Sequence, residues 1–323
     1  MTGLSAHEAR SWARALPESR KAALRALGRL EPRRNAVVVG FVVLWLAGGG
    51  AAVVGPVCWL RLLGYVLAGA ALHALGICMH EAIHGNLFRR RRLDRWAAFL
   101  CGAPVLVSGT AYRISHLAHH RHNRGELDPD EFANHFRNRK VQSVAFWVWG
   151  LLGLPIFLCH VPFSAFRRGT RTERRTVAAE YAAILGAHGA VWALLAAAGR
   201  LDLLWHAWVA PMAVTGAIVS LRGWSEHMLT RPGHPLTQTR TVTSNRVVSF
   251  LLLNLNYHLE HHLFPGIPWY NLPRVHALLR DEYDAAGAPV YRSYWRFLAD
   301  AVREGIHGLA PRPDAAAGGT PAP

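Results

Sequence analysis

The sequence predicts an all-α membrane protein, with four transmembrane helices in two hairpins and a cytoplasmic histidine-rich cap that includes interfacial helices. Three observations predict this class. Half of the chain is hydrophobic (51%) and only 17% is charged, whereas about a quarter of the residues in a soluble domain are charged. Four long stretches carry at most one acidic or basic residue each. The chain also holds 19 histidines, and their densest clusters lie at or beyond the ends of those stretches.

The four apolar stretches are long enough, or nearly so, to cross about 30 Å of hydrocarbon as helices. They pair into two hairpins because short turns, 55–61 and 199–202, join the first to the second and the third to the fourth. The predicted spans are Ala36–Val54, Leu62–Met79, Val177–Ala198 and Leu203–Leu221.

Two further apolar stretches are ambiguous. Trp96–Val107 is short and contains Pro104, and Val141–Phe163 is long enough but contains Pro155 and Pro162. Arginine and lysine are concentrated before the first span, in the loop 85–140 and after the last span, which places both termini and the histidine clusters in the cytoplasm. A full crossing by Val141–Phe163 would invert the last hairpin. We therefore expect this stretch to be re-entrant or to lie in the interface.

The chain divides into three predicted parts. Residues 1–35 form a basic cytoplasmic segment, in which Leu16, Leu27 and Leu30 indicate an amphipathic helix on the membrane surface or, alternatively, a solvated basic arm. Residues 36–280 form the membrane domain, and residues 281–323 form a cytoplasmic helix and a disordered tail rich in proline, glycine and alanine. The net charge of +16 suits the cytoplasmic leaflet of a membrane. No nucleic-acid-binding motif accompanies it, so we expect no nucleic-acid partner.

Three histidine boxes predict a metal centre. On a helix, side chains three and four residues apart lie on one face, so each box directs its imidazoles into a narrow arc. Neutral imidazole is the commonest metal ligand, and eight converging rings are more than one ion needs. His227 follows the fourth span and is a candidate ninth ligand. The boxes are His80-Glu-Ala-Ile-His84, His116-Leu-Ala-His119-His120 and His258-Leu-Glu-His261-His262.

Other metal chemistries compete for the same residues. The first box also reads HExxH, the signature of zinc proteases, with Glu81 as general base; this reading leaves six box histidines unexplained. A carboxylate di-iron site of the four-helix type needs ExxH twice, and only one copy, Glu81-Ala-Ile-His84, lies in a histidine box. A metal carrier would place ligands in mid-membrane, whereas these boxes lie at or beyond the ends of the spans.

With two hydrophobic hairpins, the boxes in this order resemble the membrane fatty-acid desaturase family over roughly residues 36–280. The third box, Asn256-Tyr-His-Leu-Glu-His-His-Leu-Phe-Pro-Gly-Ile-Pro-Trp-Tyr-Asn-Leu-Pro273, is the best match. The third box begins with His258 instead of the glutamine of front-end desaturases, and three residues separate His80 from His84 instead of the four of stearoyl-CoA desaturases. Sphingolipid desaturases and carotenoid ketolases and hydroxylases share this spacing.

The resemblance implies a non-haem di-iron centre held by the eight box histidines, with His227 as the extra ligand that some members use. Two electrons and dioxygen would remove hydrogen from an unactivated methylene, and a second hydrogen loss or an oxygen transfer would give an alkene or an alcohol. A fused haem domain is missing, so the resemblance implies a separate electron donor, a ferredoxin or small haem protein with its reductase. Spacing alone predicts only a nitrogen-rich site, which zinc or copper would also suit.

Carboxylates beside the boxes are candidates to accept the second N–H of a ligating imidazole. Asn256 is a candidate for a ligand that acts through a water molecule. The candidate carboxylates are Glu81, Asp128, Asp130, Glu226 and Glu260.

The sequence therefore predicts an integral membrane oxidoreductase of lipid metabolism that uses iron and O2, most simply a fatty-acyl desaturase. The alternatives are a hydroxylase or ketolase of a lipid or carotenoid on the same scaffold, a membrane zinc protease, and a histidine-rich metal carrier.

Overall fold

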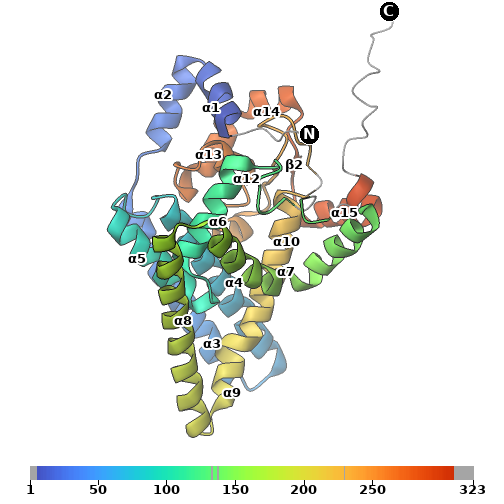
Figure 1. Cartoon of the computed structure of the whole chain (residues 1–323). Coiled ribbons are helices and arrows are strands. Elements are labelled where there is room, and N and C mark those ends of the chain that lie inside the picture. The colour runs from blue at the N-terminus through green and yellow to red at the C-terminus, as the bar shows by residue number, and fades with distance from the viewer. Residues whose placement is uncertain (1–5, 132–133, 137, 229, 309–323) are drawn as a thin grey trace, which may run out of the picture.

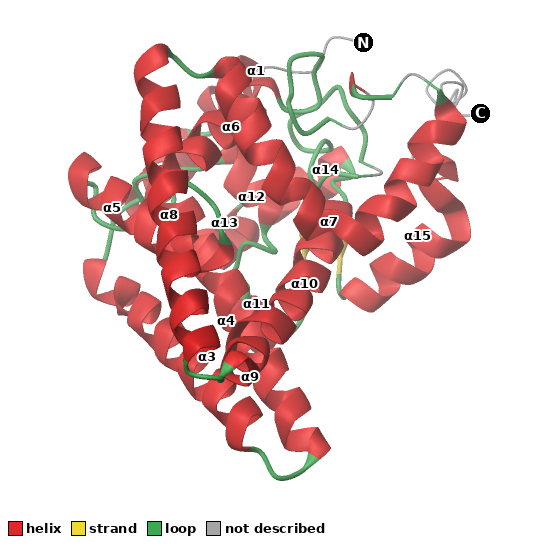
Figure 2. Ribbon diagram, turned by 60° about the horizontal axis from the view of Figure 1, so that its bottom comes forward, coloured by secondary structure: helices red, strands yellow, loops and turns green. Residues whose placement is uncertain are grey.

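The computed structural model describes residues 6–131, 134–136, 138–228 and 230–308, and these are mostly helical (Figures 1 and 2). The predicted disordered tail, 310–323, lies outside the described residues. In chain order the elements are α1 (Ala6–Ala15), α2 (Glu18–Leu27), η1 (Pro32–Ala36), α3 (Val37–Val54), α4 (Cys58–Ile83), α5 (Arg91–Gly102), η2 (Ala103–Val105), α6 (Gly109–His122), α7 (Arg139–Arg168), α8 (Arg171–Ala197), α9 (Leu201–Leu204), η4 (Trp205–Val209), α10 (Ala210–Glu226), β1 (Thr241–Val242), α11 (Arg246–Leu251), α12 (His258–Leu263), η5 (Trp269–Asn271), α13 (Leu272–Leu278), α14 (Arg280–Ala286), β2 (Val290–Tyr291) and α15 (Tyr294–Gly308).

The two predicted hairpins are present as α3–α4 and as α8 followed by the continuous run α9–η4–α10. Their turns lie at the end of the molecule opposite α1, α2, α13 and α14 (Figure 1). Helix α4 is the central one, since about two thirds of its most apolar window is buried (67%), against 22% or less for the other candidate spans. Apolar side chains such as Leu46, Leu151 and Leu194 are exposed on the outer helices, as expected where lipid replaces water.

Among the described residues, five helices, not four, are long and apolar enough to cross a membrane. The fifth is α7, the stretch that the sequence predicts to be re-entrant or interfacial. Non-helical backbone at Leu152 kinks it, and Pro155 and Pro162 lie inside it. In addition, α5–η2 and α6 form a bent pair, with an angle of 101° between its halves, which would make a sixth span if it crossed as one. The prediction of four spans is therefore not confirmed by length and composition, and the number depends on α7 and on this bent pair.

Helices α7 and α10 approach closely because a tryptophan ring of each helix packs against a glycine of the other. A Cβ on Gly150 would lie 2.2 Å from the Trp224 ring, and a Cβ on Gly223 would lie 2.6 Å from Nε1 of Trp149. The Trp224 indole stacks on Phe146 and donates to its carbonyl oxygen over 3.0 Å. This exchange of rings fixes α7 against the end of α10 that carries His227.

The N-terminal segment forms two helices, as one of the two expectations requires, and apolar side chains of both pack on protein. Leu16 and Leu24 are buried in the main core (each 7% exposed). Asn271 donates from Nδ2 to the carbonyl oxygen of Leu27 over 2.6 Å, and Arg20 pairs with Glu282 at 3.2 Å. These contacts therefore stabilise the region after the third box.

A two-stranded parallel sheet, which an all-α prediction does not include, positions the third box. Thr241 pairs with Val290 and Val242 with Tyr291. The Val242 N–H also donates to the carbonyl oxygen of Asn256 over 2.9 Å. Strands of two residues carry no periodic signal that a sequence could reveal.

Candidate metal centre

Four elements bring all nine predicted histidines together at one end of the bundle. His80 lies in the last turn of α4 and His84 at its C-terminal cap, while His227 follows α10 directly. The second and third boxes lie on α6 and on the short helix α12. The span ends therefore supply three imidazoles and the two cap helices supply six.

The histidines form two adjacent clusters. The five-histidine cluster is His80, His84, His116, His120 and His261, and the four-histidine cluster is His119, His227, His258 and His262. The rings of His120 and His262 stack at 4.2 Å between centroids, so the clusters share a wall.

The three histidines of each HxxHH box are divided between the two clusters. This corrects the sequence-based expectation that the imidazoles of one box point into a single narrow arc. In the second box, His116 and His120 join the five-histidine cluster and His119 joins the other. In the third box the division is reversed: His261 joins the five, and His258 and His262 join the four. The two histidines four positions apart stay together because they lie about 40° apart around the helix. The histidine three positions after the first lies about 60° away in the opposite direction, so it reaches the other cluster.

Within the five-histidine cluster, the Nε2 atoms face one another. They lie 3.0 Å apart for His80 and His261, and 3.1 Å apart for His84 and His116. The separations are 2.9 Å from His116 to His120 and 3.0 Å from His120 to His261. In the four-histidine cluster, Nε2 of His258 lies 2.7 Å from that of His227 and 3.1 Å from that of His262.

This donor set fits two metal ions. An imidazole nitrogen carries either one hydrogen or one lone pair, so converging Nε2 atoms present lone pairs to a common centre instead of forming a regular hydrogen-bond network. Nε2 of His119 is buried without a hydrogen-bond partner among the described residues, and the ligand atoms of His119, His227 and His262 lie within 4.8 Å of one another. Burial, and then neighbouring imidazoles, lower the pKa of His258, His261 and His262 well below the usual value, which keeps them in the neutral, ligating form.

Glu81 lies beside the first box, on the side of the His80 ring that is away from the cluster. Its Oε1 lies 3.3 Å from Nδ1 of His80, and its Oε2 accepts from the backbone N–H of Trp269 over 3.0 Å. The carboxylate therefore faces the ring nitrogen that points away from the cluster, which suits orientation of the imidazole. It is not placed as the general base that the HExxH reading requires.

Asp128 supports the second box more directly, because it hydrogen-bonds the ring that it faces, whereas Glu81 and His80 form no hydrogen bond at 3.3 Å. Its Oδ1 lies 2.8 Å from Nδ1 of His119, and Oδ2 accepts from the backbone N–H of Arg124 over 2.8 Å. Asp130 lies farther from His119, at 3.7 Å, and contacts His160 on α7 at 3.2 Å. Glu226 lies 3.6 Å from Nδ1 of His258 and accepts from Nε of Arg222 over 2.6 Å.

Glu260 and Asn256, which the sequence predicts to support the metal ligands, form contacts with other parts of the fold. Glu260 accepts from Thr241 Oγ1 and faces Nδ1 of His276, each at 2.6 Å, so it contacts no box histidine by hydrogen bonding. The Asn256 amide donates to the carbonyl oxygen of Val242 over 2.7 Å. Both side chains tie α12 to β1 and α13. Sequence alone could not separate this role from support of a metal ligand, because both roles need a polar residue beside the box.

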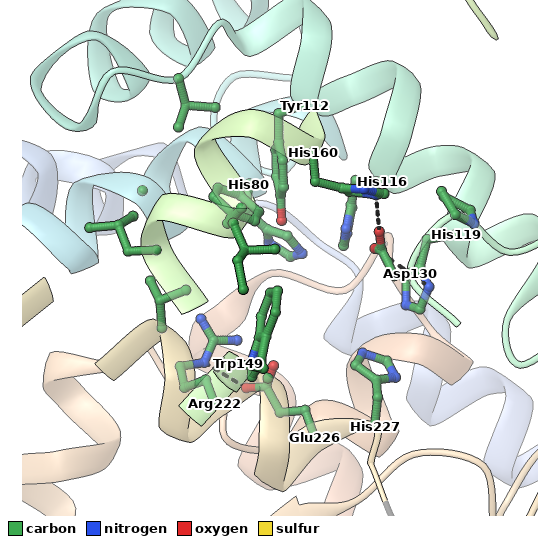
Figure 3. A pocket seen from close by; sticks show the side chains of 18 of the residues that line it. His80, Tyr112, His116, His119, Asp130, Trp149, His160, Arg222, Glu226 and His227 are labelled. Carbon is green, nitrogen blue, oxygen red and sulfur yellow. Dashed lines mark hydrogen bonds and ion pairs between the residues drawn. The ribbon is translucent and has the colours of Figure 1, made fainter. Parts of the chain in front are cut away.

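A cavity of about 580 Å³ reaches both clusters. Its wall includes His80 and His116 of the first cluster and His119, His227 and His258 of the second. Figure 3 shows His80, His116, His119 and His227 around this space, with Tyr112 and Trp149 between them. The rest of the wall is mainly apolar and comes from α4, α7, α10 and the bent pair, including Leu72, Ile77, Val105, Val107, Leu154 and Phe157.

Sequence reasoning missed Arg222, which lines this cavity. It lies one helical turn before Glu226 and five residues before His227, so an arginine near the end of an apolar span was the available signal. It also missed Tyr112, whose ring stacks on His116 at 4.9 Å between centroids.

The fold and the site define a helical membrane protein with a histidine-rich site, able to hold metal ions, on the wall of an apolar cavity. The sequence model of the fatty acid desaturase family matches residues 56–295, and the chain belongs to this family.

Curated relatives agree with this assignment. The chain is 29% identical to the sphingolipid delta(4)-desaturase/C4-monooxygenase DES2 of Homo sapiens, over 87% of this chain and 84% of the relative. It is 24% identical to the sphingolipid delta(4)-desaturase DES1 of Bos taurus, over 76% of this chain and 73% of the relative. It is 26% identical to DES1 of Xenopus tropicalis over the same shares.

Proposed function

We propose that this chain is an O2-dependent di-iron oxidoreductase that introduces a double bond or a hydroxyl group into a lipid chain. The observation that carries the proposal is the convergence of nine histidines, as five and four, with members of both clusters on the wall of one mainly apolar cavity. Family membership supports lipid desaturase or hydroxylase activity. It favours iron over zinc and copper, which imidazole ligands alone would also suit.

The nine histidines would hold the two ions, five at one and four at the other. When bound, the di-iron pair supplies the oxidising power, with O2 and two electrons, that an unactivated C–H bond requires. The chain orients the ligands through Glu81 and Asp128. The apolar wall of the cavity binds the lipid chain and excludes water from the reacting carbon.

The substrate we propose is a sphingolipid-like lipid, because the relatives named above are sphingolipid desaturases and one of them is also a C4-monooxygenase. Hydroxylation is the second candidate outcome, favoured by that second activity in the relative. A carotenoid ketolase and a zinc protease are less well supported, the latter because Glu81 faces away from the cluster.

We place the metal centre and both ends of the chain in the cytoplasm. The Glu31 N–H donates to the Tyr270 hydroxyl over 2.6 Å, so the chain before the first candidate span touches the chain after the last. The number of complete crossings between them is therefore even, whereas five helices qualify, or six if the bent pair of α5–η2 and α6 crosses as one span. We take four, with α7 re-entrant or interfacial because it contains a kink and two prolines, and the excess of arginine on this side favours the cytoplasm.

We retain residues 36–280 as the membrane domain and a separate ferredoxin or small haem protein, with its reductase, as the electron donor. The experiment that tests the function expresses the chain in a host that supplies such a donor and saturated sphingolipids. Lipid mass spectrometry should then detect products 2 mass units lighter (desaturation) or 16 heavier (hydroxylation), and the His261→Ala variant should yield neither. Unchanged lipids with a metal-loaded protein in the membrane would overturn the proposal.

A further inference from the structure

The last described helix, α15, has one apolar face packed on protein and a second apolar face that is exposed. Phe297 and Ala301 are buried against Phe146 of α7. Trp295 and Val302 lie on another side of the helix and are 81% and 66% exposed. Seven residues apart, these two positions lie about 20° from each other around the helix axis. They therefore form one outward-facing apolar stripe, a feature that marks an interaction surface.

Helix α15 is attached to the bundle where α7 presents apolar side chains outward. In both Figure 1 and Figure 2, α15 lies at the side of the bundle, next to α7. It also packs on Met228, the residue after His227, so it lies at the level of the metal centre. Val144 of α7, two residues before the contact at Phe146, is 64% exposed. A bilayer that covers the exposed face of α7 therefore reaches the edge of α15.

A second cavity, of about 250 Å³, lies between α15 and β2, apart from the cavity at the histidine clusters. Two arginines of its wall are exposed, and neither forms an ion pair or a side-chain hydrogen bond with a described residue. The wall consists of Val290, Tyr291, Arg292, Arg296 and Asp300.

This second cavity has a positive charge. Asp300 accepts from Arg303 and from the Tyr291 hydroxyl, each over 3.1 Å, so Arg303 balances its carboxylate. Arg292 and Arg296 then leave two positive charges at the cavity. Guanidinium groups bind phosphate oxygens through paired N–H donors. The wall therefore fits a phosphate group.

The apolar stripe and the arginines together select the source of that phosphate. Arg296 follows Trp295 directly and lies about 100° from it around the helix, so the basic side and the apolar stripe adjoin. This is the arrangement of a helix that lies in a membrane interface, with its aromatic side chains among the lipid tails and its arginines at the headgroups. A soluble phosphate compound would leave Trp295 and Val302 in water, and a second protein surface would not require the two unpaired arginines.

We propose that α15 binds an anionic phospholipid of the surrounding bilayer. The headgroup phosphate lies in the second cavity, beside Arg292 and Arg296, and the apolar stripe of Trp295 and Val302 contacts the lipid tails. This lipid is structural and not a substrate, because its site is separate from the cavity at the histidine clusters. The inference is independent of the proposed reaction.

The first part of the test measures binding of single lipids to the detergent-purified full chain by native mass spectrometry. The two probes are dioleoyl phosphatidylglycerol, which is anionic, and dioleoyl phosphatidylcholine, which has no net charge. The test variant is Arg292→Gln/Arg296→Gln. The matched control, Arg10→Gln/Arg14→Gln, removes two exposed arginines of α1 and so changes the net charge equally.

Each arginine at an anionic lipid surface contributes about fivefold in affinity, so the pair should give a preference for phosphatidylglycerol of about 25-fold. The Arg292→Gln/Arg296→Gln variant should bring the ratio of the two affinities close to one. The Arg10→Gln/Arg14→Gln variant should keep the preference of wild type. Because the readout is a ratio, a general loss of folded protein does not imitate the expected change.

The second part locates the apolar stripe in nanodiscs that contain both lipids. A spin label is attached through Val302→Cys, with the exposed Cys58 and Cys159 replaced by serine. Dissolved O2 should relax this label more strongly than a water-soluble nickel complex does. A label at the exposed Arg280 of α14 should show the reverse. Trp295→Gln should shift the label at position 302 towards the aqueous relaxant.

Equal affinity of wild type for the two lipids would overturn the proposal. A preference that both double variants keep would also overturn it, because the attraction would then come from the net charge of the whole chain. A label at position 302 that is exposed to the nickel complex, or protected only in a dimeric fraction, would assign the stripe to water or to a second copy of the chain.

Discussion

Single side chains behind the histidines decide how well the centre is ordered. Glu81 and Asp128 each face the Nδ1 atom of a box imidazole whose Nε2 points to a cluster. Glu260, although it stands inside the third box, faces His276 instead. The three carboxylates therefore form a matched series, in which we expect Glu81 and Asp128 to support the centre and Glu260 to support the surrounding fold.

The Glu81→Gln and Asp128→Asn substitutions should each lower metal affinity about 10- to 100-fold, the usual effect of losing a carboxylate partner of a ligating histidine. Glu260→Gln should leave metal affinity unchanged. Competition with a chelator on the purified protein measures all three. Equal losses in the three variants would show that the carboxylates act through general stability.

Some features of the site could be predicted from the sequence, and others could not. The spacing of the boxes predicted that eight imidazoles would meet, and the position of His227 after the fourth span made it a candidate ninth; all nine lie together. It did not predict their division, because this depends on how α6 and α12 are rotated relative to each other, a property of packing. Arg222 was missed for a related reason: its place in the cavity depends on the approach of α7 to α10.

Among the elements, α7 and α10 depend on small residues at their contact. A Cβ on Gly150 would overlap the Trp224 ring, and a Cβ on Gly153 would lie 2.5 Å from Oγ of Ser220. Gly186, in the middle of α8, has no atom within 4 Å of such a Cβ.

Gly150→Ala should therefore destabilise the protein by about 1–3 kcal/mol, the cost of overpacking. Gly186→Ala should be neutral or stabilise it by up to about 1 kcal/mol, because alanine has the higher helix propensity. Thermal unfolding in detergent measures both. If Gly150→Ala raises the midpoint as Gly186→Ala does, the close packing of α7 on α10 is wrong.

Helix α6, which carries the second box, is held at its start by a carboxylate of α8. Glu180 accepts from the hydroxyl groups of Ser108 and Thr110, each over 2.6 Å, and from the Thr110 N–H over 3.0 Å. These donors lie at the first turn, where a helix lacks internal partners for its N–H groups.

Glu180→Ala should cost about 1–3 kcal/mol, because it leaves these donors unsatisfied, and it should lower metal content as α6 loses its position. Asp202→Ala, which removes an exposed pair with Arg200 at the far end of the same hairpin, is the control and should change neither quantity. The two variants are compared by unfolding midpoint and by elemental analysis. A normal metal content in Glu180→Ala would mean that α6 is positioned by its other contacts.

For the whole molecule, the hydrophobic pattern predicted both hairpins and their turns, because a span that must satisfy its own backbone in lipid is long, apolar and helical. The same pattern does not decide whether α7 crosses, since length and composition qualify it while its prolines and kink allow another path. The docking of α2 on α13 and α14 was also beyond the pattern. It depends on contacts between residues more than 230 positions apart, such as Arg20 with Glu282.

The central claim is that the chain holds two metal ions, one in each histidine cluster. The most direct measurement adds ferrous iron, without oxygen, to the metal-free protein and counts the ions bound per chain. We expect wild type to bind two ions per chain. The His84→Ala/His261→Ala and His227→Ala/His262→Ala variants should each bind one ion, in the cluster that is not substituted. If wild type binds a single ion, or if either double variant still binds two, the assignment of one ion to each cluster is wrong.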